Sequence, residues 1–181
     1  MPVDHDAAPG NSKIPDRVKL GQRYHHLPGA TPRGIAVSPL LDEPLIVVTA
    51  ADQADERPVA LRELATYSLA VPPPTTDCGQ AVLHAFHQAG FTPTTRYVTA
   101  DIAAQLALAR VGLATALVPR TAIDPATPGI RMTPIEDRQI LRLLFAATRH
   151  TETANPTTTA VIAALRTAAR QGSRTTHLPA P

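Results

Sequence analysis

The sequence predicts an α/β protein with a parallel sheet flanked by helices. Continuous apolar runs such as 45–49 (LIVVT) and 114–118 (ATALV) are short, and such runs are typical of strands that are buried on both faces. Segments with the apolar spacing of helices lie between these runs, as at 77–89 and 100–111. A regular succession of strand and helix indicates parallel strands joined by covering helices.

Length and composition favour one globular domain or two small lobes. The chain has 181 residues, of which 44% are hydrophobic, whereas its 19 prolines and 3% aromatic residues imply many turns and an aliphatic core. The basic residues are dispersed and the formal net charge is only +2, which argues against a concentrated nucleic-acid-binding face. No apolar run could cross a bilayer, and the first residues do not form a secretory signal. The single cysteine, Cys78, suits a reducing compartment, so we expect a cytoplasmic protein.

The predicted strands are apolar runs bounded by turn-forming residues. Three prolines after Val71 stop one of them, and Pro119 ends another. The run 141–148 (LRLLFAAT) is expected to be fully buried. The predicted strands are 45–49, 68–71, 95–98, 114–118 and 141–148, with a possible short strand at 130–132.

The predicted helices are marked by residues that favour helix ends. Threonine, aspartate and asparagine accept hydrogen bonds from the first helical amides, and glycine adopts the left-handed conformation that closes a helix. Gly112 also permits the turn into 114–118, where the small residues Ala114 and Ala116 allow helix and strand to approach closely. A short helix is predicted to begin at Val59. Three longer helices follow: 77–89, with Thr76 or Asp77 as the N-terminal cap and Gly90 after its end; 100–111, with Thr99 as the cap and Gly112 after its end; and 156–171, with Asn155 as the cap and Gly172 after its end.

Two segments are candidate binding sites on general grounds. In parallel α/β sheets, ligands lie beyond the carboxyl ends of the strands, where helix N-termini present free backbone amides. The segments VPPPTTD (71–77) and YVTAD (97–101) each follow a predicted strand and begin a predicted helix. Pro119 ends a third strand on the same side of the sheet.

The order of these segments resembles the effector-binding domain of LysR-type transcriptional regulators. The similarity covers about residues 18–169 and is carried by PLLDEPLIVVTA, LRELATYSLAVPPPTT, HQAGFTP, TADIAAQLALARVGLATALVPR and ILRLLFAATRH. Its most specific part runs from Asp101 to Pro119, where the family has an aspartate that opens a helix and a Gly-Leu-Gly turn into a strand that ends on proline. This chain keeps Gly112 and has Ala114 at the position of the second glycine.

The resemblance implies a periplasmic-binding-protein-like (type 2) fold made of one complete lobe and part of a second. We expect a disordered leader (1–17), a remnant of the first lobe with a crossover strand (18–57), and a complete second α/β lobe (58–120). A return strand and C-terminal helix of the first lobe (121–170) and a disordered tail (171–181) would follow. Nothing in the sequence matches the family's helix-turn-helix or linker helix, so contact with DNA is expected only through a partner.

By position, the resemblance places a small effector, often an organic acid or aromatic compound, between the lobes. It would contact Thr75, Thr76, Thr99, Ala100 and Pro119. For Thr76 and Thr99, a purely capping role is an equal alternative, because a cap and an anion site use the same amides.

No cofactor, metal site or catalytic group is predicted. His84 and His87 lie one helical turn apart, but the sequence supplies no third metal ligand near them. Cys78 lies near a helix N-terminus and is expected to be an ordinary packing residue rather than a nucleophile. The sequence gives no nucleophile, general base and orienting group that can be placed together in one site, so we do not expect an enzyme.

Two functional hypotheses remain. In the first, the chain is an effector sensor that takes part in the regulation of transcription, and a helix-turn-helix encoded in frame upstream of Met1 would make it part of a DNA-binding regulator. In the second, it is an interaction module without a ligand, which forms homo-oligomers or mixed dimers with a full-length relative through exposed strand edges.

Overall fold

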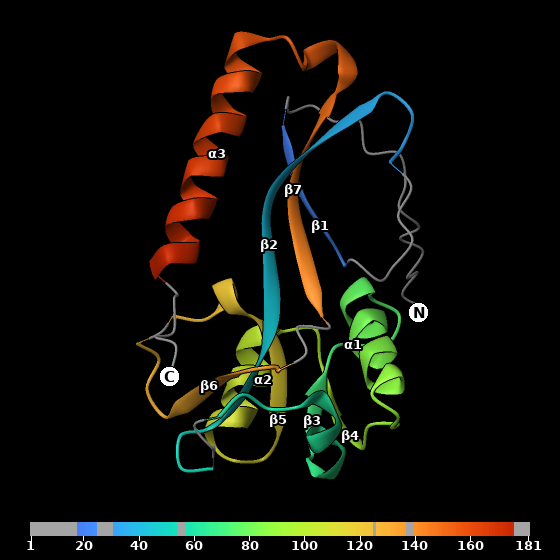
Figure 1. Cartoon of the computed structure of the whole chain (residues 1–181), viewed down its shortest axis with the longest axis vertical. Helices are drawn as coiled ribbons and strands as arrows, with labels where there is room; N and C mark the ends of the chain where they lie inside the picture. The colour runs from blue at the N-terminus through green and yellow to red at the C-terminus, as the bar shows by residue number, and fades with distance from the viewer. Residues whose placement is uncertain (1–17, 25–30, 54–56, 125, 137–139, 176–181) are drawn as a thin grey trace, which may run out of the picture.

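The structure is a computed structural model that describes residues 18–24, 31–53, 57–124, 126–136 and 140–175 (Figure 1). The predicted leader, part of the loop at 25–34 and the end of the tail lie outside these residues. The strands are β1 (Lys19–Tyr24), β2 (Ile35–Ala50), β3 (Leu69–Val71), β4 (Thr95–Val98), β5 (Thr115–Pro119), β6 (Ile130–Pro134) and β7 (Leu141–Arg149). The helices are α1 (Asp77–Gln88), α2 (Ile102–Arg110) and α3 (Pro156–Thr175), with the 3-10 helices η1 (Leu61–Thr66), η2 (Arg120–Ala122) and η3 (His150–Glu152).

One long strand, β2, connects two parts of a seven-stranded sheet. The strand order is β1-β7-β2-β5-β3-β4, and β6 pairs with β2. The first half of β2 pairs with β7, which in turn pairs with β1, and we call this the three-stranded part. The second half of β2 pairs with β5 and β6, and we call the sheet from β6 to β4 the five-stranded part. Figure 1 shows β2 running through the length of the molecule from one part to the other.

The sheet is mixed, and the expectation of a parallel sheet was wrong outside its β5-β3-β4 region. The strands β3, β4 and β5 are parallel to one another, as predicted. The strands β2, β6, β7 and β1 are all paired antiparallel. An unalternated apolar run indicates burial on both faces, and burial is the same whichever way the chain runs, so the pattern does not determine strand direction.

Two hydrophobic clusters cover the two faces of the five-stranded part. On one face α1 and η1 pack with the strands around Phe86, Leu64 and Leu117, each almost fully buried. On the other face α2 packs against β2 and β5 around Ala109 and Val118. Alternate residues of β2 therefore enter different clusters, which explains why LIVVT is apolar at nearly every position.

The three-stranded part is covered less completely. The helix α3 packs against β2, but most side chains of β7 are only half-buried, and only Ala146 and Thr148 are buried. The expectation of a fully buried 141–148 run was therefore wrong. On this sheet the ring of Phe145 occupies the space where a side chain at Gly21 would lie, and the Arg23 guanidinium carbon is 4.9 Å from the ring centroid. These contacts tie the edge strand β1 to β7.

The helix ends follow the predicted capping chemistry with two exceptions. Thr76 caps α1, Asn155 Oδ1 accepts a 3.0 Å hydrogen bond from the Thr157 amide, and Gly90 and Gly112 have positive φ. The helix α2 is capped by Asp101 rather than Thr99, and α3 continues past Gly172 to Thr175. No helix within the described part of the chain is long and apolar enough to span a membrane.

Gly79 is predicted to be required for the start of α1. It is buried in the first turn, and a Cβ atom there would overlap the carbonyl oxygen of Pro73. We expect Gly79→Ala to lower the free energy of unfolding by about 1–3 kcal/mol, the usual cost of overpacking. Urea denaturation would measure it. Gln80→Ala, at the exposed neighbouring position, is the control, and equal stability of the two variants would contradict the prediction.

Candidate functional site

The carboxyl ends of three parallel strands lie together at one edge of the five-stranded part. Because β3 lies between β4 and β5, the segments that follow these strands are neighbours in space. The Thr99 amide donates a 3.0 Å hydrogen bond to the Val71 carbonyl, which holds the end of β4 against the end of β3. The candidate segments 71–77 and 97–101 and Pro119 are thus at the same edge, as expected for parallel strands.

At the N-terminus of α1, the Thr76 hydroxyl is fully used within the protein. It accepts a 3.1 Å hydrogen bond from the Gly79 amide and donates one of 2.8 Å to the Pro73 carbonyl. The Gln80 amide bonds to the Thr76 carbonyl, so the amides of Asp77 and Cys78 are the ones that an external acceptor could use. Thr75 is exposed beside them. This helix end can therefore offer amides and the Thr75 hydroxyl to an anion.

At the start of α2, a carboxylate already occupies the helix end. Asp101 Oδ1 accepts a 2.9 Å hydrogen bond from the Ala103 amide, while Thr99 Oγ1 accepts one of 3.1 Å from the Asp101 amide. The buried Gln105 fixes the same turn, because its Nε2 donates a 2.7 Å hydrogen bond to the Thr99 carbonyl. The Asp101 carboxylate itself accepts from this helix end and so competes with an external anion, whereas the acidic residue at the start of α1, Asp77, is exposed and the cap there is the neutral Thr76.

A buried ion pair lies where the two parts of the sheet meet. Arg142 on β7 donates to the Glu43 carboxylate on β2 through Nε at 2.8 Å and also through its terminal nitrogen. The other Glu43 oxygen accepts a 3.0 Å hydrogen bond from the Thr121 amide, just after β5. Arg142 also donates to Gln22 on β1 at 3.0 Å. This network joins β1, β2, β7 and the end of β5.

A second contact links β1 to α1. Tyr24, which is almost fully buried, is coupled electrostatically to the thiol of Cys78. Burial raises the pKa of the Cys78 thiol, and burial together with Cys78 raises the pKa of Tyr24. A raised pKa keeps the thiol protonated, so Cys78 is poorly suited to act as a nucleophile.

A further arginine, Arg120, lies beside this junction. Arg120 lies at the end of β5, where burial lowers its pKa, and its Nη2 is buried with no hydrogen-bond partner in the described structure. Its neighbour Thr121 contacts both members of the Glu43–Arg142 pair. Arg120 is therefore a donor that an anion near the end of β5 could use.

The structure brings Thr75, Thr76, Thr99 and Ala100 to one edge of the sheet, with Pro119 buried behind it. Sequence reasoning missed Tyr24, Glu43, Gln105, Arg120 and Arg142. A signal was present for two of them, because Glu43 and Arg142 are charged residues within otherwise apolar strands. Their pairing could not be read from the sequence, since they are 99 positions apart.

The described residues contain no group of three or more His, Cys, Asp or Glu side chains that could hold a metal ion. His84 and His87 are both exposed on α1.

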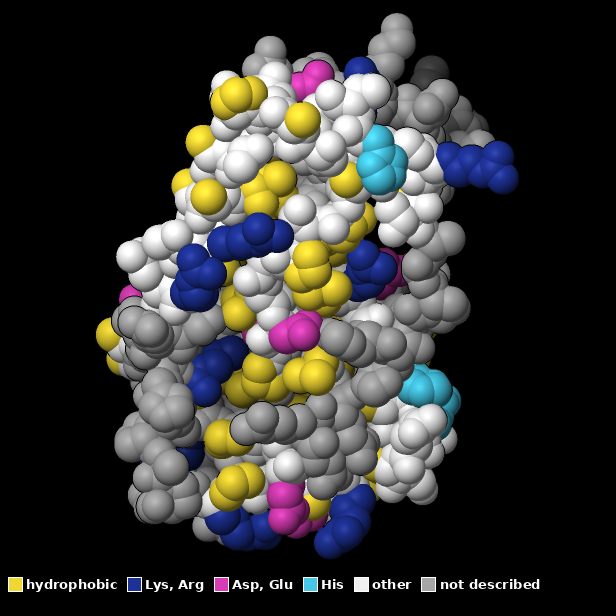
Figure 2. All heavy atoms as spheres, turned by 45° about the horizontal axis from the view of Figure 1, so that its top comes forward, with side chains coloured by type: hydrophobic (Ala, Val, Ile, Leu, Met, Phe, Trp, Pro, Cys, Tyr) yellow, Lys and Arg dark blue, Asp and Glu magenta, His cyan; other side chains and the backbone are white. Residues whose placement is uncertain are grey.

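Figure 2 shows hydrophobic side chains in a band over the middle of one face of the molecule, with Lys and Arg side chains among them.

Breaking the buried ion pair should cost more than breaking an exposed one. We expect Arg142→Met to lower the free energy of unfolding by about 3–5 kcal/mol, because Glu43 stays buried without its cation. Adding Glu43→Gln should recover part of the loss. Arg57→Met is the control, since the Arg57–Glu63 pair is exposed and should be worth less than about 1 kcal/mol. Chemical denaturation of the parent chain, the three single variants (Arg142→Met, Glu43→Gln and Arg57→Met) and the double variant would test this, and additive losses in the double variant would contradict it.

Stability should fall at alkaline pH through Cys78 and Tyr24. Both pKa values are higher in the folded protein than in the unfolded chain, so the folded state retains protons that the unfolded chain releases. The associated stability is present below about pH 8.5 and declines above it as the unfolded thiol, and then the unfolded phenol, ionise. Urea denaturation between pH 8 and 10.5 should show this decline. Cys78→Ser should reduce its slope, whereas Tyr67→Phe, at an exposed position, should not.

Comparison with known proteins identifies the family. The LysR substrate binding domain matches residues 17–170. The chain resembles the C-terminal domain of a probable LysR family regulator from a Rhodococcus species, with 20% identity, a TM-score of 0.63, and coverage of 81% of this chain and 73% of that chain. It also resembles the BenM effector binding domain with its effector benzoate, with 21% identity, a TM-score of 0.66, and coverage of 90% and 72%.

The chain spans about half the length of full-length regulators. It covers 53% of full-length CbnR in complex with its target DNA, at 21% identity and a TM-score of 0.65 over 86% of this chain. No curated protein sequence matches it. The family match extends over most of the chain, and the mixed sheet flanked by helices agrees with the solved relatives. The chain therefore belongs to the LysR substrate-binding domain family, a family of transcriptional regulator domains and not of enzymes.

Proposed function

We propose that this domain binds a small carboxylate, such as an organic acid or an aromatic acid, where the two parts of the sheet meet. The observation that carries the proposal is the pair of unused amides of Asp77 and Cys78 beside the exposed Thr75 hydroxyl. Arg120, which follows β5, adds positive charge, and its Nη2 has no hydrogen-bond partner in the described structure. The similarity to a domain that binds benzoate supports a carboxylate over a cation or a neutral sugar.

We further propose that occupancy of this site regulates transcription, with promoter contact made by a partner that carries a helix-turn-helix. The network around Glu43 and Arg142 supports this role, because it connects the ligand-facing end of β5 to β1 and β7. A ligand that contacts Thr121 or Arg120 would act directly on that network. Binding would thus alter the stability of the contacts that join β2 to β7 and β1.

Ligand binding is expected to raise the melting temperature. A ligand that binds only the folded state stabilises it by RT ln(1 + [L]/Kd), about 2.7 kcal/mol at a hundredfold excess over Kd. Differential scanning fluorimetry with a panel of aliphatic and aromatic carboxylates, each paired with its primary amide, tests the requirement for charge. A panel in which no carboxylate raises the melting temperature would count against the sensor function.

The amide of Asp77 can be removed without disturbing the helix. Proline is tolerated at the first helical position, and Thr76 already has the extended backbone that a following proline requires (φ −98°, ψ 152°). We expect Asp77→Pro to weaken binding of the best carboxylate at least tenfold, the scale of a charge-assisted hydrogen bond. Asp77→Ala keeps the amide and removes a like charge, so it should bind at least as well as the parent chain. Isothermal titration calorimetry would compare them, and equal affinity of both variants would exclude this helix end.

A second candidate function is an interaction module that forms homo-oligomers or mixed dimers with a related regulator. The observation that favours it is the position of β1 at the end of the sheet, where Leu20 is 68% exposed. Light scattering across protein concentrations and co-purification with a full-length relative would test it. Leu20→Lys should then weaken association, while a monomer that captures no relative would argue against this function.

A further inference from the structure

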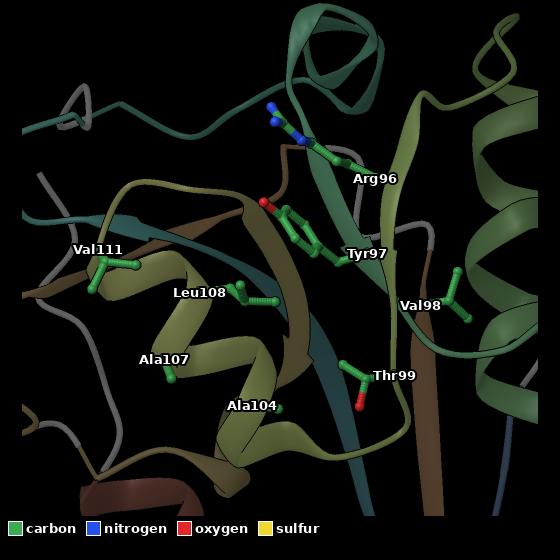
Figure 3. A pocket seen from close by; sticks show the side chains of 8 residues that line it. All are labelled: Arg96, Tyr97, Val98, Thr99, Ala104, Ala107, Leu108 and Val111. Atoms are coloured by element: carbon green, nitrogen blue, oxygen red, sulfur yellow. The ribbon is translucent and has the colours of Figure 1, made fainter.

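An apolar groove lies between β4 and α2, on the outer side of the sheet edge (Figure 3). Its volume is about 640 Å³, within the range of small-molecule sites. In Figure 3 the side chains of Tyr97 and Leu108 point toward one another across the groove, and Arg96 lies beside Tyr97 at one end. It is lined by Arg96, Tyr97, Val98, Thr99, Ala104, Ala107, Leu108 and Val111.

The helix α2 has more apolar surface than its own core contacts require. One stripe, with Ile102, Leu106 and Ala109, packs into the cluster on β2 and β5. A second stripe, at 104, 107, 108 and 111, has the same helical spacing and faces the groove. Val111 is 63% exposed at its end. A surface helix normally carries polar residues on its second face, so this stripe indicates a binding surface.

One end of the groove carries an unneutralised positive charge. The Arg96 guanidinium carbon lies 5.9 Å from the centroid of the Tyr97 ring. No carboxylate of the described residues forms an ion pair with Arg96. The remaining polar groups of the lining are the Tyr97 hydroxyl and Thr99. An occupant that suits this groove is apolar along its length and negatively charged at one end.

We propose that this groove binds a chain-like amphipathic carboxylate, of the class of medium-chain fatty acids. The carboxylate lies at Arg96 and the Tyr97 hydroxyl, and the alkyl chain follows the 104–111 stripe toward Thr99. From Ala104 to Val111 the helix rises about 10 Å, which matches an extended chain of about eight carbons. The site is separate from the proposed effector site and shares only Thr99 with it.

The groove is open to solvent along one side, so each methylene is only partly covered. Each fully buried methylene of the ligand would lower the dissociation constant about fourfold, and each partly buried methylene about twofold. We therefore expect the affinity to rise about twofold per methylene from hexanoate to octanoate, and to stop rising in longer chains that extend beyond the groove. The expected dissociation constant of octanoate is on the order of 1 mM.

The experiment is a titration of the full, isotope-labelled chain with octanoate, followed by amide and methyl NMR. The proposal expects shifts at Tyr97, Leu108 and Val111, and much smaller shifts with octanol or acetate, which lack the charge or the chain. Arg96→Gln should weaken octanoate binding at least fivefold. The matched control is Arg110→Gln, at an exposed arginine of the same helix outside the groove.

A second pair of variants tests the apolar stripe without affecting the core. Val111→Asp should abolish the shifts, whereas Leu113→Asp, at a neighbouring residue that is 49% exposed and outside the lining, should preserve them. Shifts confined to the residues around Thr76 and Thr121 would place octanoate in the effector site and overturn the proposal. Concentration-dependent broadening along β4 without octanoate binding would identify a second copy of the chain as the occupant, and would overturn it too.

Discussion

The junction between the two parts of the sheet depends on the ion pair between Glu43 and Arg142. These residues lie on the two strands that pair along the junction of the sheet parts, and both are largely buried. A buried carboxylate is tolerable only when its oxygens are hydrogen-bonded, and here one oxygen faces the guanidinium and the other the Thr121 amide. The same three groups therefore hold the pairing of β2 with β7 and the position of the segment after β5. This network includes Thr121, which lies just after β5.

The two helix starts at that edge are not equivalent, although both follow parallel strands. A neutral threonine caps α1 and leaves two amides unused, while the carboxylate of Asp101 caps α2. The free amides and the helix dipole favour an anion at α1, despite the exposed carboxylate of Asp77 in its first turn, whereas at α2 the Asp101 carboxylate already occupies the helix end. The side of α2 that faces away from the core presents the 104–111 stripe instead. The edge thus combines a polar surface at α1 with an apolar groove at β4 and α2.

Several elements followed from local chemistry alone. The strand β4 has the predicted bounds, Thr76 and Asn155 act as caps, and Gly90 and Gly112 have the positive φ that their positions suggested. For the candidate site, the sequence predicted the two segments at 71–77 and 97–101. It did not predict the side chains that lie around them, namely Gln105, Arg120 and the Glu43–Arg142 pair. Their roles arise from contacts between residues distant in the chain or from burial that the apolar pattern does not specify.

By itself, the sequence determined the order of the strands and α-helices from residue 45 onward, most of the helix ends and the family, whereas β1 and the first half of β2 were not predicted. These properties depend on neighbours within a few positions, where steric limits, capping and apolar periodicity act. Only the tertiary structure decided the antiparallel direction of β2, β6 and β7, the incomplete cover of β7, and which polar side chains meet at the junction. Those features depend on which strands become neighbours in the sheet, and a buried apolar run fits either direction and several partners equally well.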